Sequence, residues 1–387
     1  MIAHQRIETP IVLFGLIFTI LFSYLTYSTI GLRHLLVFLI GIGLGFALYK
    51  SAFGFTGGWR NFIEKKDSSA LRAQFLMLAL AVIIFSFVIG TKSFVYDGLI
   101  VGAIAPVSLS VVIGSLMFGF AMQLGGGCGS GTLFTAGSGN IKMAVTLIFF
   151  IIGSLAGTYH FTFWSSLPSL GGISLLDNYT ISDTLLVQLS LIAVLYVIVF
   201  TIDKKNNKIV HHNNIFIFTS SNLLRDPWPL FAGSVLLVFF SFLMLQAAGH
   251  PWSVTFSFGL WGAKLAALSG IDVASWDYWQ LSYPAIALEN SLLADPTTVS
   301  NLGIILGALI ASALAGNFAN QTSINKKLLY AAIIGGFFMG YGARLAFGCN
   351  IGALFSGIAS GSVHGWVWFL FAFIGSYFGV KSRKFFY

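Results

Sequence analysis

Charged residues are scarce in this chain of 387 residues. They make up 8% of it, while hydrophobic residues make up 57%. Soluble domains carry about 25% charged residues. The scarcity therefore excludes an ordinary soluble domain, because so many apolar side chains need lipid to face. We predict an all-α polytopic membrane protein whose first partner is the lipid bilayer.

The chain also lacks the motifs of common enzymes. It contains no Walker motif, metal-ligand cluster, dinucleotide fingerprint or Ser/His/Asp arrangement. The Gly-Ser-Gly tracts at 129–131 and 137–139 are not followed by the Lys-Ser or Lys-Thr pair that a phosphate loop needs. The loops are too short to hold a soluble catalytic domain. We predict a protein that is not an enzyme and that uses no cofactor and no metal.

Apolar stretches close to the ~20 residues that cross a bilayer recur along the chain. The first is too long, and lacks the small-residue cleavage site, to be a removed signal peptide. About ten transmembrane helices follow, near residues 11–30, 33–50, 70–90, 104–124, 141–163, 182–202, 229–248, 300–317, 328–345 and 363–380.

The net charge of +8 could indicate nucleic acid, but the basic residues are spread over separate short loops. One side of the predicted membrane receives Arg6, Arg60, Lys65, Lys66, Arg72, Lys142, Lys204, Lys205, Lys208, Arg225, Lys326, Lys327, Lys381, Arg383 and Lys384. The other side receives Arg33, Lys92, Lys264 and Arg344, with the acids Asp97, Asp177, Asp272, Asp277, Glu289 and Asp295. By the positive-inside rule, both termini are expected in the cytoplasm of a protein of the cell inner membrane. No nucleic-acid partner is expected.

Cysteine is the other scarce residue, and its two copies lie in a motif that occurs twice. Residues 119–134 read GFAMQLGGGCGSGTLF, and residues 340–355 read GYGARLAFGCNIGALF. Cys128 and Cys349 thus hold equivalent places. A disulfide is disfavoured because each cysteine is embedded in a glycine-rich apolar run. Small residues that permit close helix packing are the structural alternative. The duplication favours a functional role for both thiols.

The duplication extends to the arrangement of spans. Each half contains four full spans and two short interrupted segments, and one extra span at 182–202 separates the halves. The second half must then start from the opposite side of the membrane, as in transporters with inverted repeats. The predicted divisions are 1–32 for an added N-terminal helix, 33–163 for the first repeat, 164–228 for a connecting helix and loop, and 229–387 for the second repeat.

The four short segments, at 53–63, 129–139, 253–264 and 350–361, are apolar but too short to span. We predict re-entrant helices, because non-helical backbone at membrane depth must be buried in protein or line a polar cavity. Their starts would direct free N–H groups inward, which suits an anion. The predicted substrate pathway comprises Cys128, Cys349, Gly127, Gly129, Gly348, Asn350, Arg344 and Lys264. Snorkelling toward lipid headgroups is the alternative for Arg344 and Lys264.

These motifs resemble those of the YeeE/YedE family. The first sulfur-transport signature is similar to Gly125–Phe134, followed by Gly139 and Asn140. The second is similar to 342–357, continuing to 362–366, and the family's short segment of the second half resembles 251–264. The resemblance covers about residues 33–380. It implies a pseudo-symmetric membrane protein that takes up thiosulfate along an hourglass path, with Cys128 and Cys349 as its central cysteines.

One position departs from the family pattern. Thiosulfate transporters of the family commonly carry a further cysteine in the first short segment, where this chain has Gly54. The expected function is therefore uptake of a small sulfur-containing anion, most simply thiosulfate, with a related sulfur or selenium species as the alternative. A membrane thiol carrier that forms a persulfide, or a subunit of a sulfur-relay complex, is the other alternative. A cytoplasmic sulfur-carrier protein is a possible partner.

Overall fold

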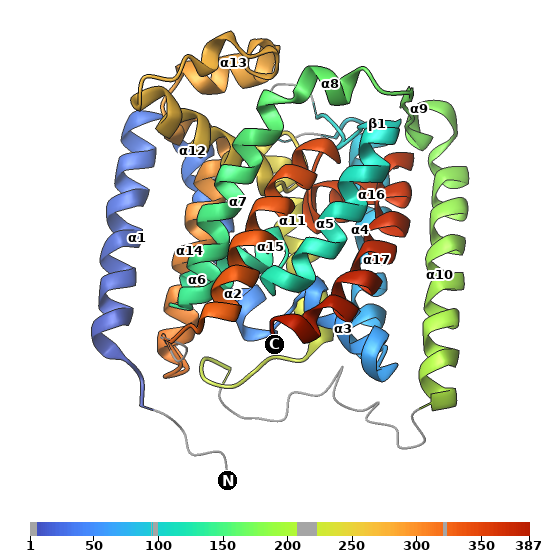
Figure 1. Cartoon of the computed structure of the whole chain (residues 1–387), viewed down its shortest axis with the longest axis horizontal. Coiled ribbons are helices and arrows are strands. Elements are labelled where there is room, and N and C mark those ends of the chain that lie inside the picture. Colours follow the sequence, from blue (N-terminus) through green and yellow to red (C-terminus); the bar gives the residue numbers. More distant parts are fainter. Residues whose placement is uncertain (1–5, 94, 96–99, 207–222, 320–322) are drawn as a thin grey trace.

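The computed structural model describes residues 6–93, 95, 100–206, 223–319 and 323–387 (Figure 1). Lys208 and Asp97, which entered the charge pattern above, lie outside the described residues. Within them, ten helices are long and apolar enough to cross a membrane, which confirms the predicted number. Their core segments are α1 Thr9–Thr29, α2 Leu32–Lys50, α4 Ser69–Gly90, α5 Leu109–Gly125, α7 Ile141–Tyr159, α10 Ile181–Asn206, α11 Leu230–Ala248, α14 Pro296–Leu314, α15 Lys326–Leu345 and α17 Val363–Ser382.

Four shorter helical pieces lie close to the predicted short segments. They are α3 Phe55–Lys65, α6 Gly129–Gly137, α12 Thr255–Leu268, and the π-helix η5 Asn350–Ser356, which runs directly into α16 Gly357–Ala359. The predicted starts at 129 and 350 agree with the structure. The starts of α3 and α12 fall two residues later than predicted, because Gly54 and Val254 are the capping residues that precede them.

The span predicted at 104–124 begins too early. Residues Pro106–Ser108 form the strand β1, which pairs antiparallel with β2 Ser169–Gly172. α5 begins only at Leu109, because the Ser108 side chain accepts a hydrogen bond from the Val111 N–H and so caps the helix. The span predicted at 141–163 is too long at its C-terminal end. The observed helix α7 ends at Tyr159, and the short helix α8 Phe161–Ser165 follows it.

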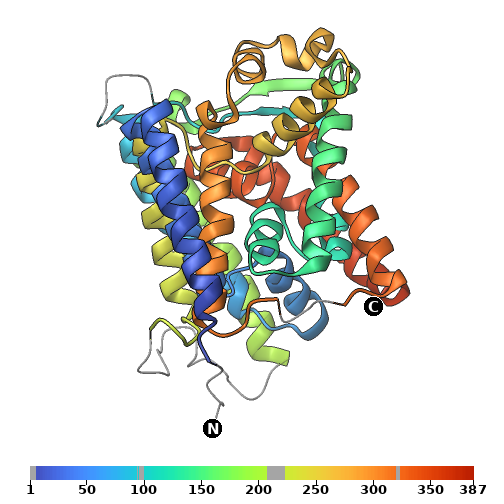
Figure 2. The ribbon, with the colours of Figure 1, turned by 90° about the vertical axis from the view of Figure 1, so that its left-hand side faces the viewer.

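The remaining short elements cover one end of the helix bundle. They are α9 Leu175–Asn178, η2 Val273–Ser275, η3 Asp277–Gln280, α13 Ser282–Glu289 and η4 Leu292–Ala294. Figures 1 and 2 place α8 and α13 at this end. α1 begins, and α10 and α17 end, at the opposite end, near the labelled chain termini. We call that end the terminal face. The last element of the chain, η6 Arg383–Phe385, also lies there.

The interior of the bundle is built from close helix pairs. α7 packs along α15, and α5 packs along both α15 and α17. Glycines set the distance: a Cβ added to Gly119 of α5 would lie 1.9 Å from the Ala372 carbonyl oxygen, and one added to Gly340 of α15 would lie 2.1 Å from that of Phe150. Small residues of this kind let membrane helices approach closely. α1 and α10 lie at opposite edges of the bundle (Figure 1) and bury little of their surface.

Candidate functional site

Cys128 lies at a sharp turn between two helices. α5 ends at Gly125, and Gly126 adopts a φ of +94°, which favours glycine. Cys128 is the residue that precedes α6, and its carbonyl oxygen accepts the Thr132 N–H at 2.8 Å. Gly127 leaves little room for a side chain, because an added Cβ would lie 3.1 Å from the Thr132 nitrogen. The local sequence therefore places the thiol at the start of a helix, where it is only 1% exposed.

Cys349 occupies the equivalent turn of the second motif. α15 ends at Leu345, and Gly348 adopts a φ of +153°. An added Cβ on Gly348 would lie 2.6 Å from the Ala353 nitrogen, so only glycine fits. Cys349 precedes η5, and its sulfur accepts the Ile351 N–H at 3.4 Å. The fully buried thiol thus lies at the start of a π-helix, a form of backbone that is frequent at functional sites.

The two cysteine turns are in contact. A Cβ added to Gly129, the residue after Cys128, would lie 2.8 Å from Cys349 Sγ and 3.4 Å from Thr255 Cγ2. Glycine at this position therefore allows the start of α6 to meet both the second thiol and the start of α12. Residues that are more than 200 positions apart in the sequence converge here. Both cysteines are free thiols.

Backbone N–H groups surround each sulfur. Those of Phe55 and Gly131 lie near Cys128 Sγ, and those of Ile351 and Gly352 lie near Cys349 Sγ. The Ser130 hydroxyl is also 3.6 Å from Cys128 Sγ. Phe55 is the first residue of α3, so the starts of two helices meet at the first thiol. The N-terminal end of a helix carries a positive partial charge and free N–H groups. The site is therefore suited to a small anion.

Open space adjoins both thiols. Within the described part of the chain, a Cβ added to Gly131 would have Cys128 Sγ, at 3.4 Å, as its one neighbour within 4 Å. One added to Gly352 would meet only Ser253 Oγ, at 3.7 Å. Both glycines lie three residues after a cysteine. Gly54 is similarly open, with the Ala52 carbonyl oxygen at 3.9 Å as the nearest described atom. A side chain at position 54 would thus fit.

Several buried polar groups near the thiols have no hydrogen-bond partner among the described residues. Beside Cys128 these are Thr56 Oγ1, Gln123 Oε1 and Thr132 Oγ1, and on the side of Cys349 they are both amide atoms of Asn350, Trp252 Nε1, Asn301 Oδ1 and Arg344 Nε. Leaving a buried polar group unpaired is costly. Such groups call for water or a bound ligand. Those on Thr132 and Asn350, which follow the two cysteines closely in the sequence, give the cysteine turns polar groups that a ligand could pair with.

The sequence profile of a family described as "Sulphur transport" matches residues 50–378. The chain belongs to the sulphur transport family. It is 24% identical over 354 residues to the thiosulfate transporter TsuA of Escherichia coli K12, covering 87% of this chain and 90% of TsuA. To TsuA of Spirochaeta thermophila it is 25% identical over 352 residues, covering 88% and 96%.

Another relative matches a shorter part of the chain at higher sequence identity. Over 133 residues the chain is 37% identical to the probable transporter YedE of Escherichia coli K12, covering 34% of this chain and 32% of YedE. The chain therefore matches about a third of the length of that relative. Membership of the sulphur transport family confirms the predicted resemblance and supports a transporter rather than an enzyme.

Arg344 lies close to the site formed by the two cysteine turns. Its guanidinium donates to the Thr255 carbonyl oxygen and to the Tyr278 hydroxyl, each at 2.6 Å. Thr255 begins α12, so Arg344 holds the start of that helix beside Gly129. The guanidinium is thus directed into the protein rather than toward lipid headgroups. Asn350, next to Cys349, is fully buried.

Lys264 lies away from the thiols. It is nine residues beyond the start of α12, about 14 Å along a helix axis. Its ammonium donates to the carbonyl oxygens of Leu288 and Asn290, and so joins α12 to the C-terminal end of α13. A role in attracting anions at the outer mouth stays a prediction for Lys264.

Two further residues hold short helices at this site: Gln123, for which the sequence favours an interhelical hydrogen bond over a pathway role, and Asn301, which the sequence does not single out. The Gln123 amide donates to the Thr56 carbonyl oxygen at 3.2 Å, and that of Asn301 donates to the Val254 carbonyl oxygen at 2.8 Å. Each side chain therefore holds the first turn of a short helix. A signal for Gln123 was available, because it occupies the place in the first motif that Arg344 occupies in the second. No comparable signal exists for Asn301.

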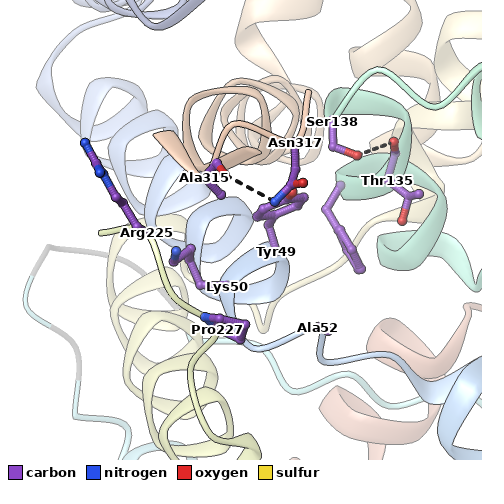
Figure 3. A pocket seen from close by; sticks show the side chains of 10 residues that line it. Tyr49, Lys50, Ala52, Thr135, Ser138, Arg225, Pro227, Ala315 and Asn317 are labelled. Carbon is purple, nitrogen blue, oxygen red and sulfur yellow. Dashed lines mark hydrogen bonds between the residues drawn. The ribbon is translucent and has the colours of Figure 1, made fainter. Parts of the chain in front are cut away.

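A separate cavity of about 350 Å³ lies near the ends of α2, α6 and α14 (Figure 3). Lys50 and Arg225 line it, together with Thr135 and Ser138 at the far end of α6 from Cys128. The Lys50 ammonium donates to the Leu224 carbonyl oxygen at 2.9 Å. The cavity therefore adjoins the C-terminal end of α6 rather than the thiols.

Proposed function

We propose that this protein carries thiosulfate, or a closely related small sulfur anion, across the inner membrane along a path that passes Cys349 and then Cys128. The observation that supports this most directly is the meeting of the two cysteine turns, where Gly129 touches Cys349 Sγ. Each thiol also adjoins open space and buried polar groups without partners among the described residues. Two relatives that align over most of this chain are thiosulfate transporters by name.

The two halves are proposed to be inverted repeats, with α3, α6, α12 and η5–α16 as re-entrant helices. The packing between the halves supports this. α5 of the first half packs against α17 of the second, and α15 of the second half packs in the equivalent way against α7 of the first. Equivalent motif glycines, Gly119 and Gly340, lie in these two contacts. An inverted repeat places a substrate site near the middle of the membrane.

The thiols are proposed to act as neutral hydrogen-bond donors. The Ile351 N–H donates to Cys349 Sγ at 3.4 Å, and the Ser130 hydroxyl lies 3.6 Å from Cys128 Sγ. Each thiol would turn its S–H toward an anion in the adjoining space. A thiol is a weak donor, but the terminal sulfur of thiosulfate is a soft, polarizable acceptor. The helix starts add a positive potential for the anion. No covalent bond to the anion is required.

Uptake into sealed vesicles tests this function. Purified protein reconstituted into liposomes is expected to accumulate ³⁵S-labelled thiosulfate above the level of protein-free liposomes, because only a transporter moves the anion into a closed space. Unlabelled thiosulfate should compete, and unlabelled sulfate, which lacks the soft terminal sulfur, should compete less well. A protein that binds labelled thiosulfate but never accumulates it would contradict transport and favour a sulfur carrier.

The terminal face is proposed to be cytoplasmic. Helices that end there carry Lys50, Lys65, Lys204, Lys205 and Lys381 in their last turns. This is the bias of the positive-inside rule. It would release the anion where a cytoplasmic sulfur-carrier protein could receive it.

Single reporter cysteines test this orientation in a cysteine-free background. Lys66→Cys and Lys384→Cys are expected to react with a membrane-impermeant maleimide only from the cytoplasmic side, and Leu175→Cys and Ser275→Cys only from outside, because the two pairs lie at opposite ends of the bundle. Labelling of intact cells and of inverted vesicles distinguishes the two sides. Labelling of positions 66 and 384 from opposite sides would refute the arrangement.

A further inference from the structure

Three cations from separate elements gather beneath the Cys128 turn on the terminal face. We call Arg60 of α3, Lys142 of α7 and Arg383 of η6 the basic cluster. Arg383 donates to the Gln123 carbonyl oxygen at 2.6 Å, and Lys142 reaches the Leu124 carbonyl oxygen at 3.4 Å. A Cβ added to Gly126 would lie 2.9 Å from Lys142 Nζ. The cluster therefore touches the chain two residues before Cys128.

Tyr387 occupies the middle of this cluster. Its hydroxyl donates to the Leu124 carbonyl oxygen at 2.9 Å and accepts a hydrogen bond from Lys142 Nζ. Its ring lies 3.6 Å from Arg383 Cζ and 4.5 Å from Lys142 Nζ. A phenol oxygen therefore sits where an oxygen of a small anion would meet the lysine.

The cluster holds more positive charge than its structural contacts require. A cation near the C-terminal end of a helix such as α5 is stabilising, but the benefit of each is small, about 0.3–1 kcal/mol. Here Lys142 and Arg60 both interact electrostatically with Arg383, and Glu64 is the carboxylate next to Arg60 in the described structure. Like charges held together repel one another. A bound anion would relieve that repulsion and accept charge-assisted hydrogen bonds.

An open strip of α3 connects the cluster to the first thiol. The strip begins at Gly54 and Phe55, whose N–H approaches Cys128 Sγ. Gly57 follows three residues after Gly54, and a Cβ there would have only Arg60 Nη2, at 3.9 Å, within 4 Å in the described part of the chain. Gly57 and Arg60, which are three apart within α3, lie on the same side of that helix. Glycines without close neighbours thus lead from the thiol to Arg60.

From these contacts we infer that Arg60, Lys142 and Arg383 form an anion-binding station at the end of the path on the terminal face, and that the Tyr387 hydroxyl occupies it when no anion is bound. The ligand class is a small oxyanion with the chemistry of thiosulfate. The role of the station in transport rests on the proposed function, but its binding of an anion requires only the basic cluster. Anions leaving Cys128 would displace the phenol from Lys142.

The station can be tested without transport. In a Cys128→Ala/Cys349→Ala background, equilibrium dialysis of ³⁵S-labelled thiosulfate against purified protein measures binding without the thiols, and the cluster variants then report the share of the station. Arg60→Gln/Lys142→Gln/Arg383→Gln is expected to bind at least about tenfold more weakly, since charge-assisted hydrogen bonds are lost. Tyr387→Phe is expected to bind at least about twofold more tightly, because it removes the oxygen that competes for Lys142.

A matched control carries the same loss of charge elsewhere on the terminal face. Lys204→Gln/Lys205→Gln/Lys326→Gln changes three exposed lysines outside the cluster and should bind as the background does. Equal weakening in this control would show a general charge effect and overturn the station. Unchanged affinity in the cluster variant would also overturn it. If that triple variant does not fold, Arg60→Gln alone, which changes a side chain outside the α5 cap, should still weaken binding about threefold.

Two further measurements distinguish a station for free anions from a lipid site and from the transport function. In nanodiscs, binding that is lost when phosphatidylglycerol replaces phosphatidylcholine would assign the cluster to a lipid headgroup and overturn the inference. Binding that persists in both lipids supports a free oxyanion. Absence of vesicle uptake by the wild type together with normal binding here would refute the proposed transport and leave the station standing.

Discussion

Vesicles that contain Cys349→Ala or Cys128→Ala should take up thiosulfate about ten to a hundred times more slowly than vesicles with the unchanged protein. Each replacement removes one S–H donor at the point where Gly129 and Cys349 meet. A hydrogen bond to a charged group is worth about 1.5–3 kcal/mol. Losing it should raise the barrier to uptake by about that amount, which slows uptake by the stated factor. Initial uptake of ³⁵S-labelled thiosulfate measures the effect.

The loss should not arise from misfolding. Alanine removes only the sulfur, and both variants should insert into the membrane and elute as the unchanged protein does in size-exclusion chromatography. Ser376→Ala is the matched control: it removes a buried hydroxyl that donates to the Gly119 carbonyl oxygen at 3.0 Å, away from the thiols. It should retain uptake. Normal uptake by the double cysteine variant would refute the role of both thiols.

Serine at the same positions distinguishes a donor from a covalent carrier. A hydroxyl can still donate a hydrogen bond, so Cys128→Ser and Cys349→Ser should retain a measurable part of uptake. A carrier needs the nucleophilicity of sulfur, which serine cannot supply. Intact-protein mass spectrometry under non-reducing conditions should find no added sulfur on either cysteine during turnover. A stable persulfide would favour the carrier.

The second large effect concerns the glycines that bring the two halves together. Gly119→Ala and Gly340→Ala should each lower the free energy of unfolding by about 1–3 kcal/mol, the usual cost of overpacking. The added methyl groups would lie 1.9 Å and 2.1 Å from backbone carbonyl oxygens of the neighbouring helices. Backbone cannot rotate away as a side chain can, so the helices must separate.

Thermal unfolding in detergent, followed by tryptophan fluorescence, measures this loss. Gly57→Ala is the matched control, because its methyl group would meet open space on α3. Alanine also favours a helix over glycine by roughly 0.5–1 kcal/mol, so the control should melt at the same temperature or slightly higher. Wild-type melting of both Gly119→Ala and Gly340→Ala would contradict the packing described for α5 and α15.

Much of the fold could be read from the sequence because lipid imposes a simple rule on it. A helix must satisfy its own backbone and needs about 20 apolar residues to cross. The ten spans follow directly from that length. The duplicated motif likewise predicted that Cys128 and Cys349 would occupy equivalent turns. In both turns the residue two positions before the cysteine has a positive φ, +94° at Gly126 and +55° at Phe347.

Only the tertiary structure decided which distant residues meet. The hydrogen bond from Asn301 to Val254 and the gathering of Arg60, Lys142 and Arg383 join residues with no pattern in common. The duplicated motif marks Gly129 and Cys349 but does not by itself give their contact. Hydrophobic periodicity reports which side of a helix is buried, but not which helix it meets. The close crossings of α5 with α17 and of α15 with α7 determine those meetings, and the short β1–β2 pairing was decided in the same way.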